Sequence, residues 1–367
     1  MNPLTKLTLK PKERTTIMKA IKLLPCLLLA LIAGKLDVHA APPPAGSQVI
    51  ESTNITVYPA GWSRPKYRLD AEDAGVVMHY GNGPDHCDEL GARDIWVWEY
   101  EGKYFMHYDG AGPKGWLVCL ATSKNLMDWE KHGAVLDLGK PGSADSATAS
   151  YGVTYFDGHK WHMFYLGSTN ASTPPDRVPV GPYLTMKAEA PSPYGPWIKK
   201  NLVVVPPNVG NASPGHIIRT GDEYRMFVSG CGNIAIARTH DLDAVWQLDK
   251  DSILSAANRI ENTSIYYQPS DKTWWLFTNH INLGTDAIWV YWTKDLDHWN
   301  ADDKAVVLDT RNCKWSKSLI GLPSVIKVGE RLAICYDGQS DPKDMWHMNR
   351  DVGLAWLKLP LVLPVKK

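Results

Sequence analysis

The sequence has no surplus of charge of either sign. Its 367 residues carry 39 Lys and Arg against 39 Asp and Glu, so the formal net charge is +0. Proteins that bind a nucleic-acid backbone or an anionic membrane surface through their overall charge need a basic excess. We therefore exclude nucleic acid and a charged membrane surface as partners.

Cysteine is also scarce, with 6 residues and no C-x-x-C spacing. This argues against a structural zinc site, and no other group of residues has the spacing of metal ligands. Cys26 precedes residue 40, and an odd number of cysteines follows it. We expect these to be mostly buried small apolar side chains, with at most one or two disulfides.

Long apolar runs are missing apart from one near the N-terminus. The stretch "MKAIKLLPCLLLALIAG" (18–34) has lysines ahead of an apolar run too short to cross a bilayer comfortably, and "VHA" (38–40) follows it. This pattern predicts a bacterial-type signal peptide over residues 1–40, with Met18 as the start. The mature protein would be periplasmic or secreted, without a membrane anchor.

Phenylalanine is rare, at 5 residues, whereas Trp and Tyr number 16 each. These rings suit sugar stacking and also a β-rich core, and for most of them we expect core packing. Five segments pair an apolar-alternating run with a turn and an aromatic-rich run. They are "DIWVWEYEGKYFMHYDG" (94–110), "YGVTYFDGHKWHMFYLG" (151–167), "GHIIRTGDEYRMFVSG" (215–230), "NTSIYYQPSDKTWWLFTN" (262–279) and "LPSVIKVGERLAICYDG" (322–338).

A further strand follows each segment, and in four of them a turn and a Trp come next, as in "ATSKNLMDW" (121–129). Repeated sheets of about four strands are typical of a β-propeller. We predict an all-β fold, a five-bladed propeller of four-stranded antiparallel blades around a central channel, over residues 93–367. Residues 41–92 would form a leader and the entry to it. Two stacked β-sandwiches are the structural alternative.

The segments "EGKYFMHYDG" (101–110) and "ATSKNLMDW" resemble the five-bladed propeller glycoside hydrolases, such as those of families 32, 43, 62, 117 and 130. The resemblance implies an exo-acting glycosidase that releases terminal sugars from plant or algal oligosaccharides, with inversion. It implies no required cofactor, although similar propellers hold a divalent ion such as calcium in the channel. Oligomeric state stays open.

Propeller geometry brings the starts of the first strands and the loops after the second strands to one face. Glycoside hydrolysis needs one protonated carboxyl group and one carboxylate. We predict Asp94 as the general base and Glu261 as the general acid, with Asp145 orienting the sugar or tuning the acid. In family 43-like enzymes a Glu opens the third blade, where this chain has "SPGH" (213–216).

A histidine is therefore the alternative acid, as the family 117 resemblance permits. The residues predicted to bind substrate are Arg93, Trp116, Arg177, His216, Asn279, His280, His347, Arg350 and Asp351. The run "HMNRD" (347–351) suits either a substrate clamp or a salt bridge that closes the ring of blades. The alternative functions are a non-catalytic carbohydrate-binding propeller and a lyase or phosphorylase on the same scaffold.

Overall fold

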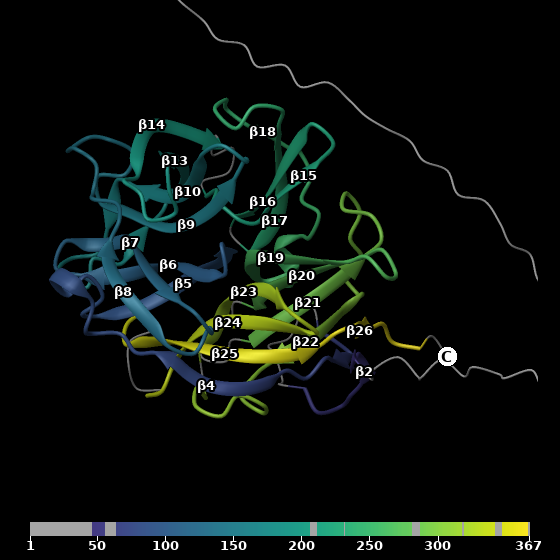
Figure 1. The fold of residues 1–367 in the computed structure, drawn as a ribbon. Coiled ribbons are helices and arrows are strands. Elements are labelled where there is room, and N and C mark those ends of the chain that lie inside the picture. Colours follow the sequence, from purple (N-terminus) through teal and green to yellow (C-terminus); the bar gives the residue numbers. More distant parts are fainter. Residues whose placement is uncertain are drawn as a thin grey trace, which may run out of the picture. The chain divides into compact units, whose positions relative to one another are not determined.

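The computed structural model describes residues 46–55, 64–205, 211–230, 232–280, 287–317, 319–341 and 347–365. Apart from two short 3-10 turns, Pro84–His86 and Ala256–Asn258, the regular structure in these ranges is β-strand (Figure 1). The all-β prediction is therefore confirmed. No helix in the described part of the chain is long and apolar enough to cross a membrane. The expected signal peptide lies outside the described residues.

Most strands fall into five groups in which chain neighbours pair in antiparallel fashion. Group one contains β5 (Gly91–Tyr100), β6 (Lys103–Gly112), β7 (Gly115–Ser123) and β8 (Trp129–Ala134). Group two contains β9 (Thr148–Phe156), β10 (Trp161–Ser168), β13 (Leu184–Ala190) and β14 (Ile198–Val205). A single parallel pair between β7 and β9 joins these two groups into one sheet. The short strands β11 (Asn170–Ala171) and β12 (Pro179–Val180) pair beside group two.

The later groups repeat this order. Group three contains β15 (Ile217–Thr220), β16 (Glu223–Gly230), β17 (Asn233–Thr239) and β18 (Gln247–Leu248). Group four contains β19 (Ile260–Gln268), β20 (Thr273–His280), β21 (Ala287–Thr293) and β22 (Lys304–Leu308) and is extended by β3 (Tyr67–Arg68) and β2 (Ile50–Glu51). Group five contains β23 (Ile320–Val328), β24 (Arg331–Gln339), β25 (Arg350–Lys358) and β4 (Glu72–Met78). The strands β1 (Ser47–Gln48) and β26 (Leu361–Val362) pair in parallel.

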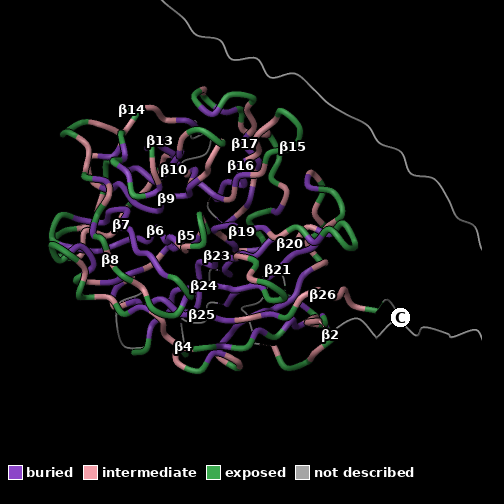
Figure 2. The backbone as a smooth tube through the Cα atoms, viewed as in Figure 1, coloured by how far each residue is buried: buried purple, intermediate pink, exposed green. Residues whose placement is uncertain are grey.

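In groups one, two, four and five the first strand lies nearest the centre and the last lies towards the periphery (Figure 1). The first strands contact one another from group to group: β5 touches β9 and β23, and β23 touches β19. Apolar faces of adjacent groups pack against each other, as where Met106 and Tyr108 of group one meet Cys335 and Leu354 of group five. The inner strands are therefore mostly buried, whereas the peripheral turns are exposed (Figure 2).

The cysteines that the structure describes after residue 40 behave as expected. All are buried and none forms a disulfide: Cys87, Cys119, Cys313 and Cys335. Cys231 lies outside the described residues. In this part of the chain, cysteine therefore acts as a small apolar side chain.

The N-terminal strand β4 completes group five. It pairs with β25 in the register Met78 to Val352 and Glu72 to Trp356. Asp73 accepts hydrogen bonds from the Tyr336 hydroxyl at 2.7 Å and from the Lys314 amide at 2.6 Å. The division expected at residue 93 therefore does not separate structural parts, because a strand that precedes it belongs to the last group.

Candidate active site

A bulge with a left-handed residue recurs near the start of the first strand in four groups. The bulged residues are Asp94, Tyr151, Asn262 and Leu322, with φ of 49, 46, 51 and 52°. At each bulge the ladder register shifts, so that two residues oppose one. A bulge breaks the alternation of a strand and re-aims side chains. Consecutive residues can therefore face the same space, which regular alternation would forbid.

The bulges of groups one, two and four surround one pocket of about 110 Å³. Its lining includes three consecutive pairs: Arg93 and Asp94, Ser150 and Tyr151, and Glu261 and Asn262. The remaining lining residues are Asp109, Trp116, Leu166, Val178, Pro179, Tyr183, Ser213 and His347. Four of the predicted site residues thus meet with Trp116 in one place, namely Arg93, Asp94, Glu261 and His347.

The carboxylate of Asp94 accepts a hydrogen bond on each of its two oxygens. Arg93 donates Nε–H to one oxygen at 2.9 Å, and the Asn262 amide donates to the other at 3.2 Å. Asp94 is 9% exposed, so it still reaches the pocket. A carboxylate fixed in this way is suited to act as a general base, because its geometry is set before the substrate arrives.

Glu261 differs electrostatically from Asp94. Burial and then the negative charge of Asp94 raise the pKa of Glu261 to about 6, against the opposing effects of Arg93, Asn279 and Arg350. Asn279 lies opposite Glu261 in the β19–β20 ladder and hydrogen bonds to it. A carboxyl group that keeps its proton up to this pH is suited to donate it to a leaving oxygen.

The Arg93 guanidinium links the acidic groups to the rest of the pocket. It pairs with Asp94, donates to His347 Nδ1 and lies 5.4 Å from the centre of the Trp116 ring. Burial, followed by the charges of Arg93 and Arg350, lowers the pKa of His347 to about 2. His347 therefore stays neutral and acts as a hydrogen-bonding group rather than as a general acid.

Two further acids lie at this site, although the sequence assigned them no role. Asp109 lines the pocket and accepts the Tyr151 amide hydrogen, and burial followed by the charge of Asp94 raises its pKa well above its usual range. Asp337 is buried and binds Arg350 at 2.8 Å. Arg350 thus belongs to a buried ion pair between β24 and β25, and because both strands belong to group five this pair does not join two groups.

Asp145 lies elsewhere. Its carboxylate accepts hydrogen bonds from Tyr165 at 2.8 Å, Ser143 at 2.9 Å and Lys199 at 2.6 Å, and it does not line the pocket. These bonds lower the pKa of Asp145 even though burial acts in the opposite direction. The interpretation of Asp145 as a residue that orients the sugar is therefore corrected, because its oxygens already bind three donors of the scaffold.

Two histidines considered as acids are structural. His216 Nδ1 accepts the Ile265 amide hydrogen at 2.9 Å, and its ring meets Trp96 edge-on. Burial lowers the pKa of His216 to about 4 and, with Arg259 and Lys304, that of His280 to about 3. His280 stacks on Trp289 at 4.5 Å. Neither lines the pocket, so the prediction that they bind substrate there is corrected.

Three other predicted binding residues are also outside the pocket lining. Asp351 accepts the Tyr80 amide hydrogen at 2.9 Å and pairs with His79. Arg177 has a left-handed φ of 46° and precedes Val178, which does line the pocket. Asn279 lies behind Glu261 rather than in the pocket. Proximity in the chain to the active face was thus insufficient, since the side chains of Asp351 and Asn279 bind partners in the scaffold.

A second hollow of about 280 Å³ adjoins the pocket and shares Tyr183, Ser213 and Glu261 with it. The remaining described residues of its lining are Asn211, Ser229, Gly230, Gly232 and Arg259. Glu261 therefore stands at the wall common to both spaces. Sequence reasoning assigned no role to Tyr151, Tyr183, Ser213 or Arg259, and only the position of Tyr151 at a first-strand start could have indicated one.

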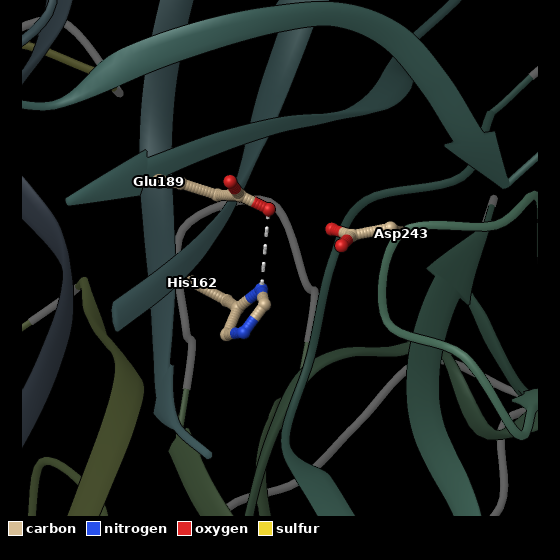
Figure 3. A group of neighbouring side chains, drawn as sticks. All are labelled: His162, Glu189 and Asp243. Carbon is tan, nitrogen blue, oxygen red and sulfur yellow. Dashed lines mark ion pairs between the residues drawn. The ribbon is translucent and has the colours of Figure 1, made fainter. Parts of the chain in front are cut away.

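A separate cluster brings His162, Glu189 and Asp243 together (Figure 3). Among the residues the structure describes, it is the only group of three such side chains whose ligand atoms all lie within 4.8 Å of one another. Lysines form ion pairs with its two carboxylates. The ammonium of Lys187 lies 2.9 Å from the Glu189 carboxylate, and that of Lys160 lies 2.9 Å from Glu189 and 3.1 Å from Asp243. The cluster is therefore an ion-pair network between groups two and three rather than a site suited to a cation.

No family model matches the chain. A stretch of 50 residues is 46% identical to the 1,2-beta-oligomannan phosphorylase of Thermoanaerobacter sp. (strain X514), covering 13% of this chain and 17% of that relative. The match thus spans about a sixth of the relative's length. It suggests a shared local motif and leaves the relative's activity a matter for proposal.

Solved structures match over most of the chain. The catalytic domain of the Coprinopsis cinerea GH62 alpha-L-arabinofuranosidase has a TM-score of 0.58 at 13% identity, covering 78% of this chain and 96% of its own. A thermostable family-43 glycoside hydrolase has a TM-score of 0.53 at 15% sequence identity. The match covers 79% of this chain and 98% of that structure. The Podospora anserina alpha-L-arabinofuranosidase PaAbf62A, in complex with cellotriose, has a TM-score of 0.57 at 12% sequence identity. The match covers 79% of this chain and 97% of that structure. The chain therefore has the fold of the β-propeller glycoside hydrolases, as its resemblance to them predicted.

Proposed function

We propose that the protein is an exported, exo-acting glycoside hydrolase on a single five-bladed propeller, whose four-stranded blades are groups one to five. The observation that carries the proposal is the position of Glu261. It stands between a small pocket that contains Asp94 and a second polar hollow. A terminal sugar in the pocket and the rest of the chain in the hollow would place the scissile oxygen beside Glu261.

The proposed reaction uses both carboxyl groups. Glu261 donates its proton to the glycosidic oxygen as the bond to the anomeric carbon breaks. A water beside Asp94 gives a proton to that carboxylate and attacks the anomeric carbon from the other face. The proton of Glu261 leaves on the alcohol product, and the released sugar has inverted configuration. Arg93 and Asn262 hold Asp94, and Trp116 and His347 contact the sugar.

Phosphorolysis is a second candidate, since the matched relative is a phosphorylase. Two cationic side chains, Arg93 and Arg259, line the two adjoining spaces and could bind phosphate. Inorganic phosphate would then replace the attacking water and the product would be a sugar phosphate. Adding phosphate to the assay separates the two candidates by the product formed.

The test is a screen of the purified protein on aryl glycosides and on plant and algal oligosaccharides, with and without inorganic phosphate. We expect release of a monosaccharide that Asp94→Asn reduces by at least about a thousandfold. Asp145→Asn is the matched control, since this carboxylate lies outside the pocket, and it should retain activity. The chemistry needs no cofactor, so EDTA should leave the rate unchanged. Sugar binding without any release would instead support a carbohydrate-binding propeller.

A further inference from the structure

A third, larger hollow lies at the other end of group four, away from the pocket and the hollow that adjoins it. Thr273 lines it and pairs with Gln268 at the far end of β19, whereas Glu261 lies near the start of that strand. Seven residues of extended chain separate the two positions by about 23 Å. The hollow measures about 500 Å³ and lies beside β3, the end of β21 and the β21–β22 turn. One monosaccharide cannot occupy both places.

Aromatic rings form much of its wall. Tyr67 and Trp292 meet edge-on with ring centres 6.1 Å apart, and Trp299 is half-buried in the same lining. The Trp299 indole N–H donates to the Leu296 carbonyl at 2.8 Å, which fixes the orientation of its ring. The rings are thus held in place before any ligand arrives, so binding would cost little side-chain entropy.

Polar groups surround these rings. Lys294 donates to the Thr273 hydroxyl at 2.6 Å, and the Asn300 amide lies 3.4 Å from the Asp303 carboxylate. Among the described lining residues Asp303 is the only carboxylate, so the hollow lacks the paired acids of the pocket. Flat apolar faces next to amide, hydroxyl and charged groups match a saccharide, whose ring has an apolar face and a hydroxylated edge.

We propose that this hollow is a second carbohydrate site, which binds an internal segment of a polysaccharide without cleaving it. This proposal rests on the proposed function, because the polysaccharide bound in the hollow is taken to be the substrate of the glycoside hydrolase. A chain held here would keep its ends near the molecule, so that the terminal sugar reaches the pocket more often. A lipid or an apolar peptide fits less well, because the polar groups of the lining would lose water without gaining partners.

The test is retardation of the protein in native gels that contain soluble arabinan, arabinoxylan or β-1,3-galactan. We expect Trp299→Ala and Asn300→Ala each to weaken retardation by about tenfold in apparent Kd for a polymer that retards the parent protein. Trp129→Ala is the matched control. Trp129 occupies the equivalent turn of group one and makes the same indole bond, to Leu126 at 3.0 Å, but it does not line the hollow.

The Asp94→Asn variant separates this proposal from the proposed function. It should lose hydrolysis and keep full retardation if the hollow binds sugar independently. Equal loss in Trp299→Ala and Trp129→Ala would show only a structural role and would overturn the proposal, as would a parent protein that none of the three polymers retards. Asn300→Ala tests the hollow without disturbing the fold, because Asn300 is exposed and its truncation leaves no cavity in the core.

Discussion

At the scale of single residues, the site depends on two carboxyl groups with different surroundings. Asp94 accepts hydrogen bonds from the Arg93 guanidinium and the Asn262 amide. Glu261 is half-buried beside Asp94, and desolvation followed by the charge of Asp94 raises its pKa to about 6. In the proposed mechanism the raised pKa of Glu261 suits it to act as the acid, and the firmly held carboxylate of Asp94 serves as the base.

Glu261 leads to a prediction about pH. If it is the acid, kcat falls as pH rises through about 6, because the proton to be donated is lost. Glu261→Gln should abolish this limb and lower kcat on oligosaccharides strongly. An aryl glycoside whose leaving group needs no protonation should be affected much less. A Glu261→Gln enzyme with an unchanged pH profile would contradict the assignment.

The same residue links activity to stability. The pKa of Glu261 is raised above the unfolded value of 4.5, so its favourable contribution is complete below pH 4.5 and is lost as pH rises through 6. Between these two pH values the free energy of unfolding of the wild type should fall by about 2 kcal/mol, and that of Glu261→Gln should not show this fall. Chemical denaturation at pH 4 and pH 7 measures the difference, and parallel losses in both proteins would count against it.

At the scale of elements, two features shape the molecule: the bulges in the first strands, and the strand β4, which precedes group one in the chain but pairs within group five. The bulges turn consecutive side chains into the pocket, and β4 supplies the outer strand of group five. Asp73 ties β4 to this group through the Tyr336 hydroxyl and the Lys314 amide. Both donors would lose their partner if the carboxylate were removed.

We therefore expect Asp73→Ala to reduce the free energy of unfolding by about 3 kcal/mol. Glu72→Ala, at the exposed neighbouring position of the same strand, should change it by less than about 0.5 kcal/mol. Urea unfolding of the two variants provides the comparison. Equal stabilities would show that β4 contributes little to the group.

At the scale of the whole molecule, ion pairs and apolar faces join neighbouring groups. The ammonium of Lys187 is fully buried and binds the Leu242 carbonyl at 2.7 Å together with Glu189 and Asp243. Removing one partner of a buried ion pair leaves the other charges poorly compensated. This network joins a strand of group two to the loop after β17.

Lys187→Met should therefore lower the free energy of unfolding by about 3 kcal/mol. Lys200→Met should cost less than about 1 kcal/mol, because Lys200 is exposed and pairs only with Glu189 in the same network. Thermal unfolding at low and high salt would distinguish them. A similar small effect for both would show that the network does not hold the two groups together.

The sequence by itself determined the strand pattern, the repeat and the positions of Arg93, Asp94 and Glu261 at first-strand starts. These follow from local physics, since alternation and turn residues act over a few neighbours. Trp116 and His347 also line the pocket, whereas Asp145, His216 and His280 do not. The sequence pattern could not show this, because partners on other strands, such as Lys199 for Asp145 and Trp289 for His280, hold these side chains.

Tertiary structure decided what no local pattern encodes. The bulges at Tyr151 and Asn262, the pairing of β4 with β25 and the shared wall at Glu261 each depend on residues far apart in the chain. The Asn262 amide reaches an aspartate 168 positions away. The pKa of Glu261 is likewise set by burial and by a charge on another strand, so the chemistry of the site emerges only when the groups have packed together.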